Sequence, residues 1–286
     1  MSGFFARRPP DRPGLAVFLN AGDPPLPVLA DLLRMLDDCR VDCLELAVPF
    51  PDSVTDGPVI RRSARRALAE GGGLDEVLDF LGGILPRLRH LRVALLADWS
   101  HTVRELTVPG FVRRVADSGV DGLLVHALPP RLRPGYLDAA REAGLPVVAT
   151  CYAGSTAEVR AAAAESATAY LYLVARYGRS GGELTADHRE LAAALAALRG
   201  TATAPTDVPT TAPTTAPTAT PTTAPIAVGF GVRSWADIAR LHRLGADAAV
   251  VGSAGVARIE RALAEGADVV EEFHTFVHTV SPYSNR

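Results

Sequence analysis

Residues 41–48 read Val-Asp-Cys-Leu-Glu-Leu-Ala-Val, a short apolar run with an acidic residue at its centre. Seven more short apolar runs occur along the chain, and amphipathic stretches separate them. Continuous apolar runs, rather than strict alternation, are typical of parallel strands that are covered on both faces. The eight predicted strands are Ala16–Asn20, Val41–Val48, Leu91–Ala97, Gly122–His126, Pro146–Cys151, Ala169–Val174, Ile226–Gly229 and Ala248–Val251.

Helical periodicity fills the intervals between these runs. Clear examples are Pro25–Asp38, Pro134–Ala143, Thr185–Leu198 and Ser234–Leu244. Eight strand–helix units in 286 residues predict an α/β protein with a single (β/α)8 TIM barrel, which typically needs about 250 residues. An open doubly wound sheet is the alternative, but no G-x-G-x-x-G motif follows the first strand.

Residues 201–225 differ in composition from the rest of the chain. Proline recurs at every fourth position from Pro205 to Pro225, separated mainly by threonine and alanine. Such a segment cannot build a core and is expected to be a disordered or polyproline-like loop. It falls between the sixth helix and the seventh strand, at the bottom of the predicted barrel. We therefore expect one barrel domain over residues 1–286 with a tolerated insertion.

Composition excludes several classes of function. The chain contains no lysine, and all 29 basic residues are arginine. Schiff-base aldolases and pyridoxal-phosphate enzymes need a lysine amine, so both are excluded, and we expect no cofactor. A net charge of −3 without a basic block argues against nucleic acid. No apolar run is long enough for a membrane helix or a signal peptide, so a soluble, cytoplasmic protein is expected.

The three cysteines Cys39, Cys43 and Cys151 suggest neither a metal cluster nor a disulfide framework. Buried free thiols are the expected state, and no metal site is predicted.

Glu45 is a charged residue inside an apolar strand and shares one strand face with Cys43 and Ala47. If that face lines the barrel interior, desolvation would raise its pKa and suit it to proton transfer. A buried structural ion pair with an arginine is the alternative. Asp52 and Asp56 follow in a loop, where Asp56 before Gly57-Pro58 could simply cap the next helix.

Glycine-rich loops follow three of the last strands. Gly229-Phe230-Gly231 and Gly252-Ser253-Ala254 follow the seventh and eighth strands, and residues 178–182 follow the sixth. In barrels the loops after strands 7 and 8 often hold a phosphate, because glycine lets backbone N–H groups approach the anion. A phosphorylated small-molecule substrate is therefore predicted.

The segment ELAVPFPDSVTDGPVIRRSARRAL at residues 45–68 resembles the signature of the tryptophan synthase α-subunit family. FLNAGDP at 18–24, YLVARYGRSGGE at 172–183, GFGV at 229–232 and VGSAGV at 251–256 also look like motifs of that family, in the same order. The resemblance implies a lyase of tryptophan biosynthesis. Such an enzyme cleaves indole-3-glycerol phosphate to indole and glyceraldehyde 3-phosphate by general acid/base catalysis. A β subunit is its usual partner, in a heterotetramer; a stand-alone enzyme is the alternative.

The same resemblance assigns residue roles. Glu45 matches the general acid/base, and Asp56 matches the acid that stabilises charge on the indole nitrogen. The residues matching the indole pocket are Phe18, Leu96, Leu124, Tyr172 and Phe230. Those matching the phosphate ligands are Gly181, Gly231, Gly252 and Ser253.

The chain departs from the family pattern at several places. Residues 49–53 exchange a serine and a proline, Asp98 and Trp99 replace a usual tyrosine-containing stretch, and His126 stands where a small residue is usual. Two further hypotheses follow. The chain could be a related barrel lyase acting on another phosphorylated substrate, or a non-catalytic regulatory subunit of a β-type partner. Retention of both Glu45 and Asp56 argues against the second.

Overall fold

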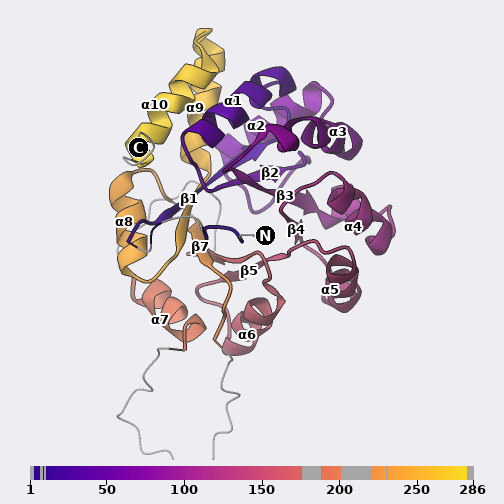
Figure 1. Cartoon of the computed structure of the whole chain (residues 1–286), viewed down its shortest axis with the longest axis vertical. Coiled ribbons are helices and arrows are strands. Elements are labelled where there is room, and N and C mark those ends of the chain that lie inside the picture. The colour runs from indigo at the N-terminus through magenta and orange to yellow at the C-terminus, as the bar shows by residue number, and fades with distance from the viewer. Residues whose placement is uncertain are drawn as a thin grey trace, which may run out of the picture.

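The computed structural model describes residues 3–6, 9, 11–175, 188–200, 221–229 and 231–281. Eight parallel strands form its centre, and helices surround them (Figure 1). The strands are Gly14–Asn20 (β1), Cys43–Ala47 (β2), Arg92–Asp98 (β3), Gly122–His126 (β4), Val148–Tyr152 (β5), Tyr170–Val174 (β6), Ile226–Gly229 (β7) and Ala248–Val251 (β8). The long helices are Leu26–Asp38 (α1), Pro58–Ala69 (α2), Leu74–Ile84 (α3), Val108–Asp117 (α4), Arg133–Glu142 (α5), Ala157–Ser166 (α6), His188–Leu198 (α7), Trp235–Arg243 (α8), Ser253–Glu265 (α9) and Val269–Val280 (α10).

The sheet order is β4-β3-β2-β1-β8-β7-β6-β5, so the first and last strands pair and the sheet curls round on itself. At the remaining seam, β4 meets β5 through a single bridge between Leu123 and Val147. The barrel is therefore nearly closed, and the predicted fold class is confirmed. An open doubly wound sheet is ruled out by the pairing of β1 with β8.

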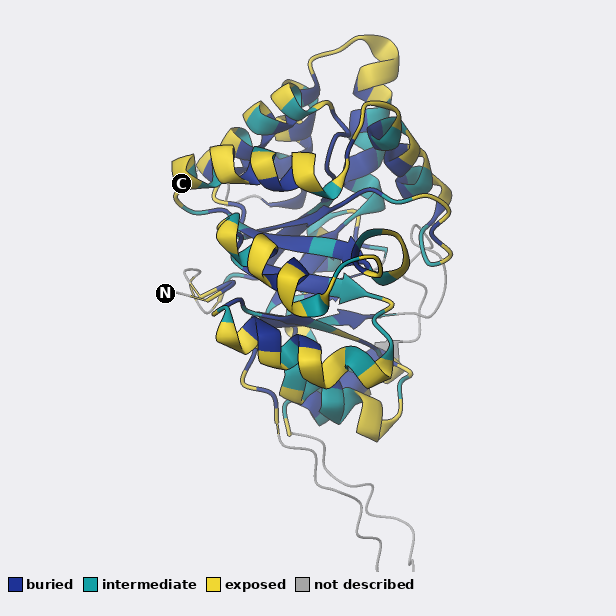
Figure 2. Ribbon diagram, turned by 90° about the vertical axis from the view of Figure 1, so that its right-hand side faces the viewer, coloured by how far each residue is buried: buried dark blue, intermediate teal, exposed yellow. Residues whose placement is uncertain are grey.

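Burial follows this architecture. The strands are mostly buried, whereas the helices expose their outer faces (Figure 2). One apolar cluster lies between the strands and the helices, and a second, smaller one fills the barrel interior. Apolar side chains packed on both sides of each strand explain why the sequence shows runs instead of alternation.

Two aromatic side chains that precede β1 close the bottom of the barrel. Phe4 and Phe5 are buried and meet the ring of Tyr170 edge-on, with centroids 5.1 and 5.5 Å apart. A Cβ atom at Gly14 would lie 2.7 Å from the Phe5 ring, so glycine at the start of β1 makes room for it. The N-terminal segment thus contributes to the core at the bottom of the barrel.

Of the predicted insertion 201–225, only residues 221–225 lie in the described part of the chain. The Thr222 N–H donates to the Leu198 carbonyl at 2.9 Å, which ties the end of α7 to the approach to β7. Among the described residues, no helix combines the length and apolarity needed to cross a membrane.

Candidate active site

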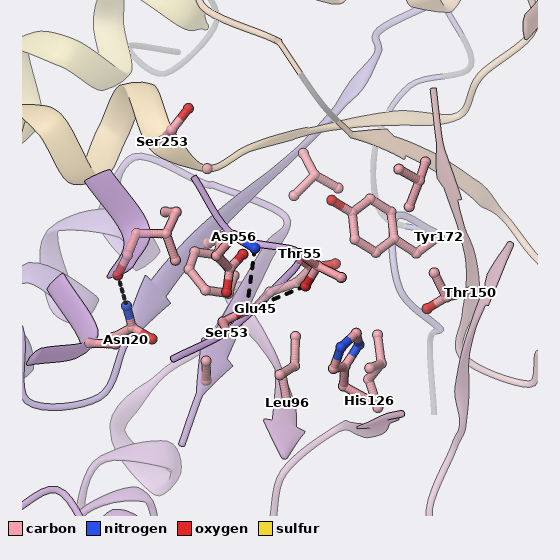
Figure 3. Close-up of a pocket in the computed structure, with 18 of the residues that line it drawn as sticks. Asn20, Glu45, Ser53, Thr55, Asp56, Leu96, His126, Thr150, Tyr172 and Ser253 are labelled. Carbon is pink, nitrogen blue, oxygen red and sulfur yellow. Dashed lines mark hydrogen bonds between the residues drawn. The ribbon is translucent and has the colours of Figure 1, made fainter. Parts of the chain in front are cut away.

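A cavity of about 130 Å³ opens at the carboxyl ends of the strands, the end at which barrel enzymes place their active sites. Both predicted catalytic residues, Glu45 and Asp56, line it (Figure 3). The other predicted residues that line it are Phe18, Leu96, Leu124, Tyr172, Gly231, Gly252 and Ser253. Gly181 and Phe230 lie outside the described residues.

Glu45 points into the barrel from β2, on the same strand face as Cys43, which belongs to the interior cluster. Its exposed fraction is 2 %. The Tyr170 hydroxyl donates to Glu45 Oε1 at 2.6 Å. Burial raises the pKa of Glu45 to about 7, and the Tyr170 hydrogen bond acts in the opposite direction. The partner of this carboxyl group among the described residues is a tyrosine, so the alternative of a buried ion pair with an arginine is not supported.

Asp56 belongs to the loop between β2 and α2 and is half-buried. Its backbone N–H donates to Ser53 Oγ at 3.3 Å, which holds the loop against the cavity. Burial raises the pKa of Asp56, while Ser53 and the nearby His126 and Arg61 oppose that shift. The expectation that Asp56 caps the next helix is wrong. The N-cap of α2 is Gly57 without a side-chain bond, because the loop turns the Asp56 carboxyl group toward the cavity.

Asp98 and His126, the last residues of β3 and β4, have different surroundings. Asp98 caps the π-helical turn Trp99–Val103, accepting from the Ser100 and His101 N–H groups at 2.9 and 3.1 Å. Its Oδ1 also contacts His101 Nδ1 at 2.8 Å. Asp98 therefore stabilises this turn and is not among the residues that line the cavity. His126, by contrast, lines the cavity.

The apolar wall includes Tyr172, which faces Glu45 and Asp56 from β6 (Figure 3). A Cβ atom at Gly229 would lie 2.3 Å from the Tyr172 hydroxyl oxygen. Glycine at the end of β7 is therefore needed for the Tyr172 ring to occupy this position, a steric role that the sequence did not reveal. Burial raises the pKa of Tyr172 well above its usual range, so the ring stays neutral beside the carboxyl groups.

The residues predicted to bind phosphate line another part of the cavity wall, at the start of α9 and after β7. Gly231 has φ +77°, a left-handed conformation that favours glycine. Helix α9 begins at Ser253 with Gly252 as N-cap and no side-chain capping bond. The neighbouring α8 is capped by Ser234 and Asp237 in a capping box. The N-terminus of α9 therefore lies at the cavity, and its first-turn N–H groups carry partial positive charge and have no partner within the helix.

Sequence reasoning missed several cavity residues. Asn20, Thr150 and Tyr152 line the cavity, and Tyr170 lies beneath it as the partner of Glu45. The sequence did contain one indication for Tyr170. It lies two residues before Tyr172 on the same strand, so both side chains point to the same face of that strand. The cavity thus combines a carboxyl group with a pKa near 7, a second carboxyl group, an apolar wall and a helix N-terminus. Such a combination can support acid/base chemistry on a substrate that carries an apolar ring and a negative charge.

Comparison with known proteins gives a consistent result. A family model described as tryptophan synthase alpha chain matches residues 4–209 and 211–285. The chain is 33% identical over 260 residues to the tryptophan synthase alpha chain of Trichormus variabilis, covering 91% of this chain and 89% of that one. It is 34% identical over 248 residues to that of Gloeobacter violaceus, covering 87% and 82%. A mutant tryptophan synthase alpha-subunit from Pyrococcus furiosus superposes with a TM-score of 0.77 at 26% identity, covering 98% of this chain and 99% of that one.

Proposed function

The chain belongs to the tryptophan synthase alpha chain family, and from this premise we propose how its cavity performs the family's lyase reaction. The substrate is indole-3-glycerol phosphate, and the products are indole and glyceraldehyde 3-phosphate. The observation that carries the assignment of roles is the buried Glu45 carboxyl group, with its pKa near 7, in the same cavity as Asp56.

Glu45 serves both proton steps. Its protonated carboxyl group delivers a proton to C3 of the indole ring, which turns that carbon into a leaving group. The resulting carboxylate then takes the proton of the side-chain hydroxyl group as the carbon–carbon bond breaks. The bond electrons return to the indole ring and the oxygen becomes the aldehyde carbonyl. Glu45 ends the cycle protonated, which a pKa near the working pH allows.

Asp56 balances the positive charge that C3 protonation leaves on the indole nitrogen. Its loop position allows the carboxylate to accept a hydrogen bond from the ring N–H while Phe18, Leu96, Leu124 and Tyr172 enclose the ring. Gly231, Gly252 and Ser253 would bind the phosphate through backbone N–H groups and the α9 N-terminus. Binding at both ends of the substrate would fix the reacting carbon near Glu45.

The decisive experiment is an assay of indole formation from indole-3-glycerol phosphate, with and without a β-type subunit. Indole formed by wild type and not by Glu45→Gln supports the proposal. Turnover of a different phosphorylated substrate instead would favour the related-lyase hypothesis. No turnover, combined with stimulation of a β-type subunit, would favour the regulatory-subunit hypothesis.

A β-type subunit is the partner we propose, in a heterotetramer, with the protein acting in the cytoplasm. The loop that carries Asp56 also carries Val54, a large apolar residue that is 81% exposed. We infer that this exposed apolar side chain, on the loop beside the cavity, contacts the β-type subunit.

Val54→Asp should weaken co-purification with a β-type subunit at least about tenfold, the effect of losing one well-buried interface side chain. Val159→Asp is the matched control, because Val159 is an exposed valine on α6, 51% exposed. Equal binding by both variants would move the interface away from this loop. Basal indole formation without the partner separates a lost contact from a lost fold.

A further inference from the structure

Three side chains of types that can bind a metal ion meet away from the catalytic cavity: Cys39 is buried, His278 is partly buried and His274 is exposed. Cys39 is the C-cap residue of α1, and His274 and His278 lie on α10. Their ligand atoms all lie within 4.8 Å of one another. The two helices pack together, although they come from opposite ends of the chain (Figure 1). None of the three residues lines the catalytic cavity.

The histidine pair already has its ring nitrogens aimed at one another. His274 and His278 are four residues apart and therefore share one helix face. Their Nε2 atoms are 2.9 Å apart, and their rings meet edge-on with centroids 4.3 Å apart. Burial, and to a lesser degree His274, lowers the pKa of His278. A neutral imidazole at neutral pH is the form that binds metal ions.

Cys39 contributes a protonated sulfur beside this pair. Its thiol donates to Met35 Sδ at 3.7 Å. Burial and the nearby Asp38 raise the pKa of the Cys39 thiol, so the proton stays on sulfur until a cation displaces it. His274 is exposed, and its ring can rotate to meet an incoming ion.

We propose that Cys39, His274 and His278 bind one thiophilic divalent transition-metal ion, with Zn²⁺ the best fit, and that the ion ties α1 to α10. One thiolate and two imidazoles are typical zinc ligands, and three protein ligands leave the fourth position of the tetrahedron to solvent water. Zinc–nitrogen bonds near 2.0 Å and zinc–sulfur bonds near 2.3 Å separate such ligands by about 3.3 to 3.6 Å. Side-chain rotations bring the present atoms into that range.

Binding is an acid–base exchange without redox change. The Cys39 S–H bond breaks, its proton passes to solvent, and a sulfur–metal bond forms. The hydrogen bond between the two histidines is replaced by two nitrogen–metal bonds. About one proton should therefore be released per ion bound near neutral pH.

Co²⁺ is the probe, titrated into the metal-free full-length chain. We expect binding of one ion, with the near-ultraviolet charge-transfer band of a thiolate ligand and the visible bands of tetrahedral cobalt. Zn²⁺ should abolish both and raise the thermal unfolding midpoint. Cys39→Ser should remove the thiolate band, and the double variant His274→Ala, His278→Ala should weaken binding about 10²-fold or more.

Matched controls are Cys151→Ser, a buried cysteine elsewhere in the fold, and His242→Ala on α8. Both should bind Co²⁺ as wild type does. Absence of the thiolate band in wild type, or equal affinity in Cys39→Ser and wild type, would overturn the proposal. If a variant fails to fold, calorimetry of wild type in buffers of different ionisation enthalpy still decides: release of no proton on Zn²⁺ binding rules out Cys39 as a ligand.

Discussion

The two carboxyl groups of the cavity come from one short stretch of chain but lie in different environments. Every residue of β2 is buried, and Glu45 is held there by strand pairing on both sides and by Tyr170. Asp56 lies in the following loop, half-buried and near the exposed Val54. Burial thus raises the pKa of both groups, to about 7 for Glu45 in the strand, whereas for Asp56 in the loop the polar neighbours Ser53, His126 and Arg61 oppose the rise.

This contrast separates the two roles without any difference in side-chain chemistry. A carboxylic acid in the strand can donate a proton to carbon, and a carboxylate in the loop can offset a developing positive charge. The account therefore predicts that equivalent changes in the two regions have unequal effects.

The largest effect should come from Glu45→Gln. The amide keeps the shape and can still accept from Tyr170, but it cannot carry a proton. Proton transfer by a positioned side chain contributes about 10²–10⁴-fold, and one group here serves two steps, so kcat should fall by the upper end of that range or more. Folding and binding of a phosphate-bearing ligand should stay close to wild type. A variant that turns over within about tenfold of wild type would remove Glu45 from the mechanism.

Asp56→Asn should be less damaging, with a loss of roughly 10- to 10²-fold in kcat/KM, because the amide oxygen still accepts from the indole N–H. Asp52→Asn is the matched control in the same loop. Asp52 is exposed and has φ +56°, which asparagine tolerates, so this change should leave kcat/KM unaffected. Equal losses in both variants would show a general loop effect and not a charge effect.

Burial of Glu45 within β2 should also lower the free energy of unfolding at high pH. The pKa of Glu45 rises from 4.5 when unfolded to about 7 when folded. Between these values the folded chain binds more protons than the unfolded chain, so stability falls as pH rises through this window. Glu45→Gln removes that cost and should be more stable than wild type at pH 8, by about 3 kcal/mol. At pH 4 the difference should vanish, and thermal unfolding at both pH values tests this.

The smallest effect concerns Tyr170→Phe. Its hydroxyl donates to Glu45 and lowers that pKa, so its removal should raise the pKa further. The basic limb of kcat/KM against pH should move upward, while the acidic limb stays in place. Tyr136→Phe is the matched control, because the buried Tyr136 hydroxyl donates to the Leu123 carbonyl instead. An unmoved basic limb in Tyr170→Phe would contradict the coupling.

The sequence was most informative where one physical pattern determines the outcome. Apolar runs and the intervals between them predicted eight strands separated by helices. The fold class predicted from them is confirmed, because the first strand pairs with the last in one curled sheet. The family was predicted from the motif around Glu45, and it is confirmed. Strand parity also placed Glu45 on the face that proves to line the interior.

The sequence was least informative for contacts between distant residues. Nothing around Glu45 indicates that Tyr170 is its partner, because that contact depends on barrel curvature. Asp56 was compatible with a helix cap until the loop conformation was known. The meeting of Cys39 with His274 and His278 could not be predicted either, because it requires α10 to return beside α1.

The central claim is that Glu45 carries a dissociable proton near neutral pH inside β2. Its most direct test is an infrared titration of the protonated carboxyl band, taken as wild type minus Glu45→Gln, alongside kcat/KM for indole formation. The account predicts that the difference band disappears with a midpoint of about 7, and that kcat/KM falls with the same midpoint. A midpoint near 4.5, the ordinary value for this side chain, would contradict it.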